Sequence, residues 1–299
     1  MKNEIIVTVP KEFSFIENVT YLSRSTNECL FEIREGKIIK ALALGNEIYL
    51  IEVSENRDGH LRVRFLGESV PQSEEIMNQV TNYVRDWFDL DTDLTHFYVM
   101  AEHDILLKQA VTQFYGLRNM GIPDLFEALC WGILGQQINL SYAYTLKRRL
   151  VESFGRSMEW EGKRYWLFPN PEDIAQLTVE DLSELKMTVK KCEYLIGVAQ
   201  LMVEGSLSKE LLRSVGDFKV AEKMLTKIRG IGPWTANYVL MRCLRFSNSF
   251  PIDDVGLHNA IKHVLGTSRK PTKEEILKLA APWKNWESYA TFYLWRFLY

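Results

Sequence analysis

Cysteine is scarce in this 299-residue sequence, and the few cysteines are scattered. The four are Cys29, Cys130, Cys192 and Cys243, and no two of them form a C-x-x-C pair. Their spacing is unlike a disulfide framework or a zinc site, and it excludes a ferredoxin-type iron–sulfur cluster. We therefore expect reduced, mostly buried thiols, no side-chain metal site and no cofactor.

Long apolar runs are also lacking. No segment approaches the roughly 18 apolar residues that a membrane-spanning helix needs. The N-terminus, MKNEIIVTVPKEF, places Pro10 at the end of a short apolar run and has no small-residue cleavage site, unlike a signal peptide. We expect a cytoplasmic protein that does not bind membranes.

The sequence has no large excess of charge of either sign. It contains 36 Lys and Arg against 39 Asp and Glu, and 46% of its residues are hydrophobic, which excludes a disordered chain. The charge is nevertheless divided: residues 1–120 hold 12 basic and 19 acidic side chains, whereas residues 121–299 hold 24 and 20. This difference suggests two units that face different surroundings. Solvated faces on both parts are the alternative.

The first part is β-rich, with four short runs of Ile, Leu, Val, Phe and Tyr over residues 28–67. The runs are separated at Glu35-Gly36, Gly45-Asn46 and Asp58-Gly59. Such pairs favour tight turns, because glycine readily adopts a positive φ. Apolar residues at helical spacing follow at Ile76, Val80, Val84 and Trp87. We predict an N-terminal α/β domain over residues 1–95, in which a helix closes a small antiparallel β-sheet.

The remaining sequence has a helical pattern. Pro123 lies near the start of a helix in IPDLFEALCWGILGQQINLSYAYTLKRRLVESFG, and Gly135 marks a break between two helices. Further apolar residues recur at i, i+3 and i+4 in EDIAQLTVEDLSELKMTVKKCEYLIGVAQLMVEG. We predict an all-α bundle over residues 96–299, which gives the whole chain an α+β fold.

The most informative segment is LTKIRGIGPWTANYVLMRCL, residues 225–244. An apolar helix end meets Arg229-Gly230-Ile231-Gly232, and Pro233 opens a second helix. Two glycines separated by one residue allow a tight turn, and the next helix N-terminus offers unpaired N–H groups to an anion such as phosphate. The pattern resembles a DNA-binding helix-hairpin-helix element, and a plain helix–helix turn is the alternative.

Two adjacent acids begin the next helical segment, FPIDDVGLHNAIKHVLG. Aspartate is a favoured N-cap residue, so a purely structural role would explain Asp253 and Asp254. With two acids side by side, however, one can cap the helix while the other points into a cleft.

Together these segments resemble the helix-hairpin-helix base-excision DNA glycosylases, and most closely the AlkA-type DNA-3-methyladenine glycosylases. The resemblance covers most of residues 120–299, including KIRGIGPWTANYVLMR, FPIDDVGLHNAI and the tail APWKNWESYATFYLWRFLY. The β-rich unit is consistent with the family's extra domain. The resemblance implies that Asp254 is the catalytic carboxylate and that Asp253 is the helix cap. The implied base pocket is lined by Trp234, Tyr238 and Trp295, with a weaker match at Tyr21.

The resemblance also implies a DNA interface, with double-stranded damaged DNA as the partner. One residue of Gln136-Gln137 would fill the gap left by a flipped base, and Gln137 is favoured. The other predicted DNA contacts are Gly230, Gly232, Thr235, Lys190, Lys191 and Arg245. A solvated face would explain each of the three basic residues equally well.

The implied reaction hydrolyses the N-glycosidic bond of an alkylated purine such as 3-methyladenine. Alkylation makes the base cationic and a good leaving group, and an aromatic cage stabilises such a cation. Asp254 would stabilise positive charge on the sugar, orient the attacking water, or do both. Val255 follows it where the best-known family member carries an aromatic residue, so one wall of the pocket is expected to differ.

The hairpin lacks lysine: none lies between Lys227 and Lys262. Bifunctional relatives place a Schiff-base lysine where this chain has Trp234, so we expect a monofunctional enzyme without lyase activity. The resemblance implies the 3-methyladenine glycosylase II type, and we expect a monomer. A monovalent cation on the hairpin carbonyls is the one ion that the resemblance allows. Two alternatives stay open: the same fold acting on oxidised or deaminated bases, and a non-catalytic protein that binds damaged DNA.

Overall fold

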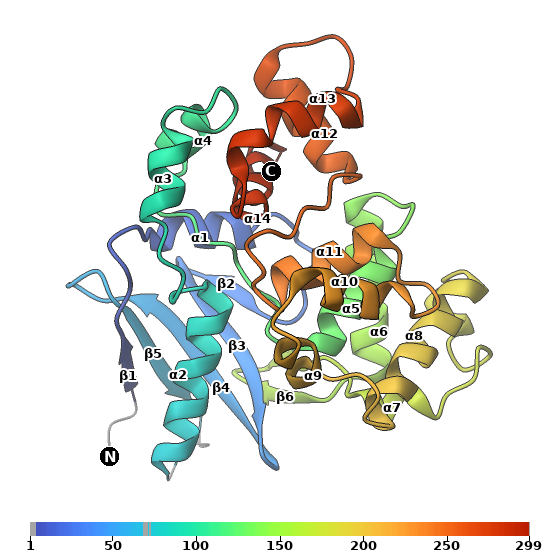
Figure 1. The fold of residues 1–299 in the computed structure, drawn as a ribbon. Helices are drawn as coiled ribbons and strands as arrows, with labels where there is room; N and C mark the ends of the chain where they lie inside the picture. The colour runs from blue at the N-terminus through green and yellow to red at the C-terminus, as the bar shows by residue number, and fades with distance from the viewer. Residues whose placement is uncertain (1–3, 68–70, 72, 299) are drawn as a thin grey trace.

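A twisted β-sheet lies on one side of the molecule and a larger group of helices on the other (Figure 1). This computed structural model describes residues 4–67, 71 and 73–298. The main sheet has the order β1-β5-β4-β3-β2, with every neighbouring pair antiparallel. Its strands are β1 (Glu4–Val7), β2 (Glu32–Arg34), β3 (Lys37–Leu44), β4 (Glu47–Glu55) and β5 (Leu61–Leu66). The predicted small antiparallel sheet is confirmed.

Helix α2 (Glu74–Phe88) covers one face of this sheet, as the apolar spacing predicted. Its buried side chains Val80, Val84 and Trp87 form one cluster with the inward residues of the strands. Helix α1 (Phe15–Leu22) was not predicted, because it is only eight residues long. A signal was nevertheless present, since Ser14 caps the helix by accepting a hydrogen bond from the Glu17 N–H, as in a Ser-x-x-Glu motif.

The other helices form two groups. The first group lies beside α1 and consists of α3 (Thr95–Ala101), α4 (Leu107–Gln113), α12 (Val255–Leu265), α13 (Lys273–Leu279) and α14 (Glu287–Trp295). The second consists of α5 (Leu125–Leu134), α6 (Leu140–Phe154), α7 (Pro171–Ala175), α8 (Val189–Val203), α9 (Lys209–Ser214), α10 (Phe218–Thr226) and α11 (Pro233–Arg242). Short 3-10 helices lie between α7 and α8 (Ser183–Leu185), between α13 and α14 (Ala281–Trp283) and after α14 (Arg296–Leu298).

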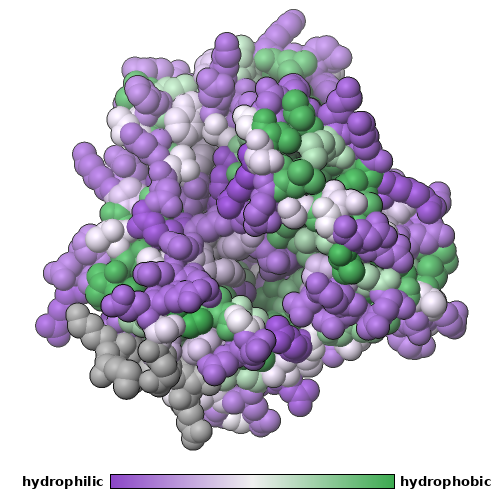
Figure 2. Space-filling view, turned by 60° about the horizontal axis from the view of Figure 1, so that its bottom comes forward, coloured by the Kyte–Doolittle hydropathy of each residue, from purple (hydrophilic) through white to green (hydrophobic). Residues whose placement is uncertain are grey.

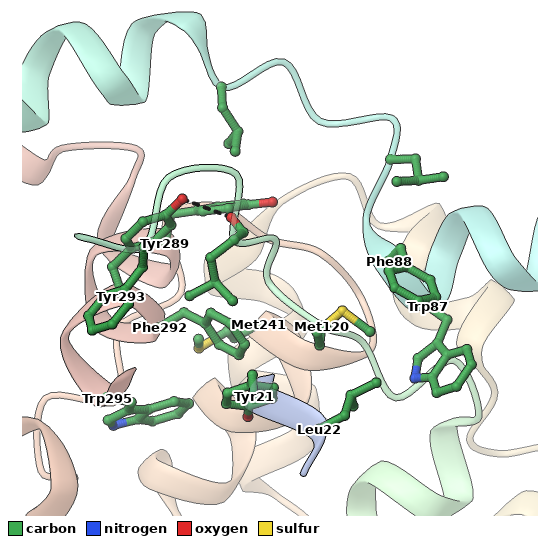
Figure 3. Packing of buried hydrophobic residues seen from close by; sticks show 14 of the residues in the cluster. Tyr21, Leu22, Trp87, Phe88, Met120, Met241, Tyr289, Phe292, Tyr293 and Trp295 are labelled. Atoms are coloured by element: carbon green, nitrogen blue, oxygen red, sulfur yellow. Dashed lines mark hydrogen bonds between the residues drawn. The ribbon is translucent and has the colours of Figure 1, made fainter. Parts of the chain in front are cut away.

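A continuous hydrophobic cluster joins the sheet and α2 to the first helical group. Figure 3 shows Tyr21 of α1, Met241 of α11, and Phe292 and Trp295 of α14 packed in one neighbourhood. The Tyr21 and Phe292 ring centres are 4.5 Å apart. The cluster therefore crosses the predicted boundary at residue 95 and brings the N-terminal helix α1 against the C-terminal helix α14.

The prediction of an all-α second unit is wrong, because strands β6 (Ser157–Trp160) and β7 (Lys163–Trp166) form an antiparallel hairpin within it. The turn residues Glu161 and Gly162 have φ values of 49° and 71°. This Glu-Gly pair is the same turn signal as Glu35-Gly36, so the sequence carried the information. The hairpin packs on the face of the sheet away from α2, where Tyr165 contributes to a small separate cluster.

Polar side chains dominate the face of the molecule drawn in Figure 2, which has small, separate hydrophobic areas and a hollow near its centre. Within residues 4–67, 71 and 73–298, no helix is both long and apolar enough to cross a membrane.

Candidate active site and DNA interface

A cavity of about 820 Å³ opens between α1, the α5–α6 loop, α11, the start of α12 and α14. This volume lies within the range of small-molecule sites. Predicted site residues that line it are Tyr21, Gln136, Gln137, Trp234, Tyr238, Asp254 and Trp295. Arg24, Trp131, Arg242 and Gly256 also line it and were not identified from the sequence. Segments that lie more than 200 residues apart in the chain therefore meet at one site.

Asp254 is held at the wall of this cavity by three donors. Its Oδ1 accepts hydrogen bonds from the Leu257 N–H at 2.7 Å and the Trp295 Nε1–H at 2.8 Å. Its Oδ2 accepts one from the Trp234 Nε1–H, also at 2.8 Å. Both carboxylate oxygens are thus oriented before any substrate binds, as electrostatic catalysis requires.

The predicted division of roles between the two acids is wrong. Asp254 itself is the N-cap of α12, whereas Asp253 is exposed and forms an ion pair with Lys273 at 2.9 Å. One carboxylate can do both tasks, because its two oxygens have lone pairs for the helix N–H and for the cavity side. Gly256 makes room for this arrangement, since a Cβ there would lie 2.8 Å from Asp254 Oδ1.

The predicted aromatic residues come together along the cavity wall. The ring centres of Trp234 and Tyr238 are 5.6 Å apart, and those of Tyr238 and Trp295 are 6.2 Å apart. The Tyr238 hydroxyl accepts a hydrogen bond from Arg242 at 3.0 Å. Burial raises the pKa of Tyr238 and the Arg242 charge only partly opposes this, so the phenol stays neutral at physiological pH. Tyr21 lies nearby, buried against α14.

The predicted helix-hairpin-helix is formed by α10, the turn and α11. Gly230 has a φ of 93°, and a Cβ there would lie 2.2 Å from the Tyr194 ring, so the turn accepts only glycine. Gly232 is exposed at the N-cap of α11, and no side chain caps this helix. No side chain therefore occupies the backbone N–H groups at the start of α11, and such groups suit a phosphate.

The two glutamines of the α5–α6 loop have different environments. The Gln136 Nε2 group donates to the Gly230 carbonyl at 2.8 Å and to Thr235 Oγ1 at 3.1 Å. Thr235 is 1% exposed, so the prediction that its side chain contacts DNA is corrected. Gln136 is half-buried and lines the cavity, so its predicted DNA contact stays a prediction. Gln137, by contrast, is exposed at the cavity edge with a φ of 57°.

Two predicted basic contacts are also structural, in contrast to the exposed Lys190 at the start of α8. Lys191 is buried and donates to the Leu134 carbonyl at 2.7 Å, which satisfies the end of α5. The Arg245 Nε–H donates to Asp86 at 3.0 Å and thereby ties the loop after α11 to α2. The predictions that Lys191 and Arg245 bind DNA are therefore corrected. The positions of charged residues in the sequence do not show which of their side chains are buried.

Four exposed residues are the ones that DNA could reach, and we call Gln137, Lys190, Gly232 and Val255 the rim. Gln137 and Val255 line the cavity, and Val255 is 63% exposed at the first turn of α12. Gly232 lies at the hairpin turn and Lys190 at the start of α8. Within the described part of the chain, no three His, Cys, Asp or Glu side chains are grouped to hold a metal ion. In the hairpin, the Ile228 carbonyl accepts a hydrogen bond from the Ile231 N–H and the Gly230 carbonyl accepts one from Gln136.

The sequence matches the models of two protein families and a bacterial DNA glycosylase. Residues 130–285 match the family model of HhH-GPD superfamily base excision DNA repair proteins, and residues 11–129 match the N-terminal domain model of 8-oxoguanine DNA glycosylase. A DNA-3-methyladenine glycosylase of Bacillus subtilis is 57% identical over 295 residues, covering 99% of this chain and 97% of the relative.

Solved structures share the whole fold. The 3-methyladenine DNA-glycosylase of Archaeoglobus fulgidus superimposes with a TM-score of 0.79 at 22% identity, covering 98% of this chain and 97% of that one. The 8-oxoguanine glycosylase/lyase of Clostridium acetobutylicum, in complex with double-stranded DNA, gives 0.76 at 20% identity, covering 99% and 95%. The chain therefore belongs to the HhH-GPD superfamily of base excision DNA repair proteins.

Proposed function

We propose that this chain is a monofunctional DNA glycosylase of the 3-methyladenine glycosylase II type. It hydrolyses the N-glycosidic bond of alkylated purines in double-stranded DNA and thereby starts base excision repair. The observation that carries the proposal is the carboxylate of Asp254, fixed by the indole N–H groups of Trp234 and Trp295 at the wall of an aromatic cavity. The high identity to the Bacillus subtilis enzyme supports the same substrate class.

The cavity suits a flipped nucleotide. A base inside a duplex is inaccessible, so it must rotate out of the stack, and Gln137 at the cavity edge is positioned to fill the gap. The exposed Lys190 and the N–H groups beside Gly232 would contact the backbone on both sides of the lesion. Helix α11 carries both the phosphate-binding turn and the pocket tryptophan, so binding the strand aligns it with the pocket.

Asp254 would act on the sugar. As the bond to the base breaks, positive charge develops on the deoxyribose, and a fixed carboxylate stabilises that charge without reorganisation. The same carboxylate can orient the water that attacks C1′. A binding protein without catalysis would not need an acid held by three donors, so the non-catalytic alternative has less support.

A lyase step is not expected. Schiff-base chemistry needs an amine at the sugar, and the residues that line the cavity in the described structure include no lysine. Trp234, at the corresponding place in the hairpin, donates to Asp254 instead. We also propose that the enzyme acts as a monomer in the cytoplasm and needs no cofactor, with a monovalent cation on the hairpin carbonyls as the only bound ion.

The proposal is tested by incubating the purified protein with N-methylated duplex DNA and identifying the freed base by chromatography. We expect release of 3-methyladenine, an intact abasic strand, and no covalent complex after borohydride reduction. A duplex containing 8-oxoguanine serves as the comparison substrate. Release of 8-oxoguanine alone would favour the oxidised-base alternative, and a borohydride-trapped complex would overturn the monofunctional assignment.

A further inference from the structure

A groove of about 790 Å³ lies between the segment of residues 22–33, which leads into strand β2, and a wall formed by α6 and strand β7. Among the described residues, it shares no lining residue with the base cavity. We call it the edge groove, because β2 is an outer strand of the five-stranded sheet and β7 belongs to a separate two-stranded sheet.

Strand β2 directs backbone hydrogen-bonding groups into this groove. It pairs with β3 through the two-residue turn Glu35-Gly36, whose φ values are 53° and 72°. The residues beside such a turn form a hydrogen-bonded pair and the pairs then alternate, so the N–H and C=O of Ile33 point away from β3. Phe31 lies in the same phase, and its backbone makes no hydrogen bond within the described structure. Both residues line the groove, and a sheet edge of this kind can accept a further strand.

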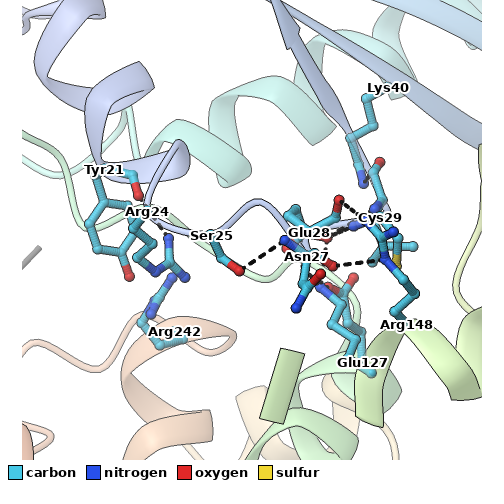
Figure 4. A network of polar contacts seen from close by, with 12 residues as sticks. Tyr21, Arg24, Ser25, Asn27, Glu28, Cys29, Lys40, Glu127, Arg148 and Arg242 are labelled. Carbon is cyan, nitrogen blue, oxygen red and sulfur yellow. Dashed lines mark hydrogen bonds and ion pairs between the residues drawn. The ribbon is translucent and has the colours of Figure 1, made fainter. Parts of the chain in front are cut away.

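The wall opposite this edge carries two arginines without a carboxylate partner. Arg148 of α6 donates to the three carbonyl groups of residues 26–28, each at 3.3 Å, and Figure 4 shows this side chain beside that segment. Arg164 of β7 is exposed, and its Cζ lies 5.4 Å from the Trp166 ring centre. In the part of the chain that the structure describes, neither guanidinium has a carboxylate within ion-pair distance.

Three carboxylates also line the groove, and two of them are neutralised. Glu28 pairs with the buried Lys147 at 3.2 Å, and Glu32 pairs with Lys163 at 2.6 Å. Glu152 of α6 is exposed and has no ion pair to another described residue. The groove therefore presents two unpaired cations against one unpaired anion, and this balance favours an acidic occupant.

We propose that the edge groove binds an extended, acidic segment of a partner protein, which adds a strand to β2 and places carboxylates beside Arg148 and Arg164. In this mode of recognition, main-chain hydrogen bonds supply affinity and the flanking side chains supply specificity. A nucleic-acid backbone matches the edge poorly. Its phosphates only accept hydrogen bonds, so the carbonyl groups of Phe31 and Ile33 would stay unpaired.

The position of the groove separates this binding from catalysis. Helix α6 begins at Leu140, which lines the base cavity, and Arg148 lies about 12 Å further along the helix axis at a rise of 1.5 Å per residue. We therefore expect the partner to bind while damaged DNA occupies the base cavity. The inference does not depend on the glycosylase activity proposed above.

The test measures the binding of short fluorescent peptides to the full chain by fluorescence anisotropy. The probe alternates Glu and Val, and a second peptide that alternates Lys and Val reverses its charge. A third peptide has the sequence of the probe with alternate amides N-methylated, so that these amides cannot donate to the sheet edge. We expect saturable binding of the probe, roughly 10-fold weaker binding of the methylated peptide, and no binding of the Lys–Val peptide.

Substitutions in the groove test the role of charge. Arg164→Gln should weaken probe binding roughly 10-fold, because a charge-assisted hydrogen bond is lost. Glu152→Gln should strengthen binding about 2- to 5-fold, because a repulsive charge is removed. The matched control is Arg57→Gln, which removes an exposed arginine of the β4–β5 turn, outside the groove, and should leave the affinity unchanged. All three variants should keep the Tm and the 3-methyladenine release rate of the wild type.

Several results would overturn the inference. Equal affinity for the probe and the methylated peptide would show that β2 does not pair with the peptide. Absence of probe binding, equal binding of the Lys–Val peptide, or unchanged affinity in Arg164→Gln would exclude an acidic partner. If single-stranded DNA displaces the probe and binds Arg164→Gln more weakly than the wild type, the groove binds nucleic acid instead. Base release is measured separately, so failure of the proposed function is distinguished from failure of this inference.

Discussion

The base pocket and its rim are built in opposite ways. In the pocket, Asp254 receives hydrogen bonds from Trp234, Trp295 and Leu257, so its position is fixed by the fold. At the rim, the exposed side chains of Gln137 and Lys190 make no hydrogen bond to the rest of the described chain. The proposed catalytic group is preorganised, whereas the groups proposed to face DNA are free to adapt to it.

Because of this difference, substitutions in the pocket and substitutions at the rim should change different measured quantities. A group that stabilises developing charge must be oriented before the reaction, so changes in the pocket should reduce the rate of base release. Contacts to phosphate position the duplex and depend on salt, so changes at the rim should reduce affinity. Residues that brace either region from inside should change stability.

Apart from replacing Asp254 itself, the largest expected effect comes from removing both indole donors to its carboxylate. The double substitution Trp234→Phe and Trp295→Phe keeps an aromatic ring at each position but leaves only the Leu257 N–H to orient the carboxylate. We expect roughly a 100-fold lower single-turnover rate on methylated duplex DNA, because hydrogen bonds to charged groups are strong and misorientation is costly. Affinity for an abasic-site duplex should change far less; an equal loss in affinity would show that the rings act mainly in binding.

The next largest effect is expected from breaking the ion pairs that connect α2 to the second helical group. Asp86 pairs with Lys209 at 2.8 Å and Arg245 at 3.0 Å, and its side chain is 22% exposed. We expect Asp86→Asn to lower the free energy of unfolding by about 2 kcal/mol in urea titrations, somewhat less than for a fully buried pair. DNA affinity per folded molecule should not change, and a large specific loss of affinity would restore Arg245 as a DNA contact.

The ion pairs of Asp86 also predict that the stability of the fold depends on pH. Burial alone would raise the pKa of Asp86, but the Arg245 and Lys209 charges lower it below its ordinary value. A carboxylate with a lowered folded-state pKa stabilises the fold above its unfolded-state pKa, and this stabilisation is lost as the pH falls through the folded-state pKa. Asp86→Asn should therefore be less destabilising in acid than at neutral pH.

The pocket could be predicted from the sequence better than the basic DNA contacts. Asp254, Trp234 and Tyr238 lie close together in the chain around one hairpin motif, so the motif alone was enough to predict that they share a site, and they line the same cavity. The contacts of Lys191 and Arg245 depend on segments far away in the sequence, Leu134 and Asp86. Charge patterning cannot distinguish a solvent-facing cation from one that satisfies a distant carbonyl or carboxylate.

The fold class was predicted correctly, but the β6–β7 hairpin within the helical part was missed. The antiparallel sheet and α2 follow from local turn signals and apolar spacing, whereas β6 and β7 are four residues each and gain stability by packing on a distant sheet. Arg24 was missed because its position depends on the hydrophobic packing of α1 against α14.

The two glutamines give a paired comparison within one loop. Gln136→Ala leaves the hairpin carbonyl and Thr235 without their donor, so we expect about 1 kcal/mol lower stability by thermal or urea unfolding. Gln137→Ala should keep full stability and instead reduce the extent of base flipping, measured by the fluorescence of 2-aminopurine next to the lesion. The reverse assignment would mean that Gln136 inserts into the duplex.

The smallest effect is expected for Lys190. Lys190→Ala should weaken duplex binding only a few-fold and lower the slope of log affinity against log salt by about one, as for the loss of one phosphate contact. Lys191→Ala is the matched neighbour, and it should reduce stability without changing the salt slope. A salt slope unchanged in Lys190→Ala would remove this residue from the interface.

The account depends most on Asp254, and its neighbour Asp253 offers a control of the same charge. The measurement is the single-turnover rate of 3-methyladenine release by Asp254→Asn and by Asp253→Asn, with lesion-duplex affinity recorded for each. Asparagine remains a good helix cap at position 254, and Asp253 is exposed, so both variants should fold. We predict that Asp254→Asn releases the base roughly 10³-fold more slowly while still binding the lesion, and that Asp253→Asn behaves as the wild type. Wild-type release by Asp254→Asn, or an equal loss in both variants, would contradict the account.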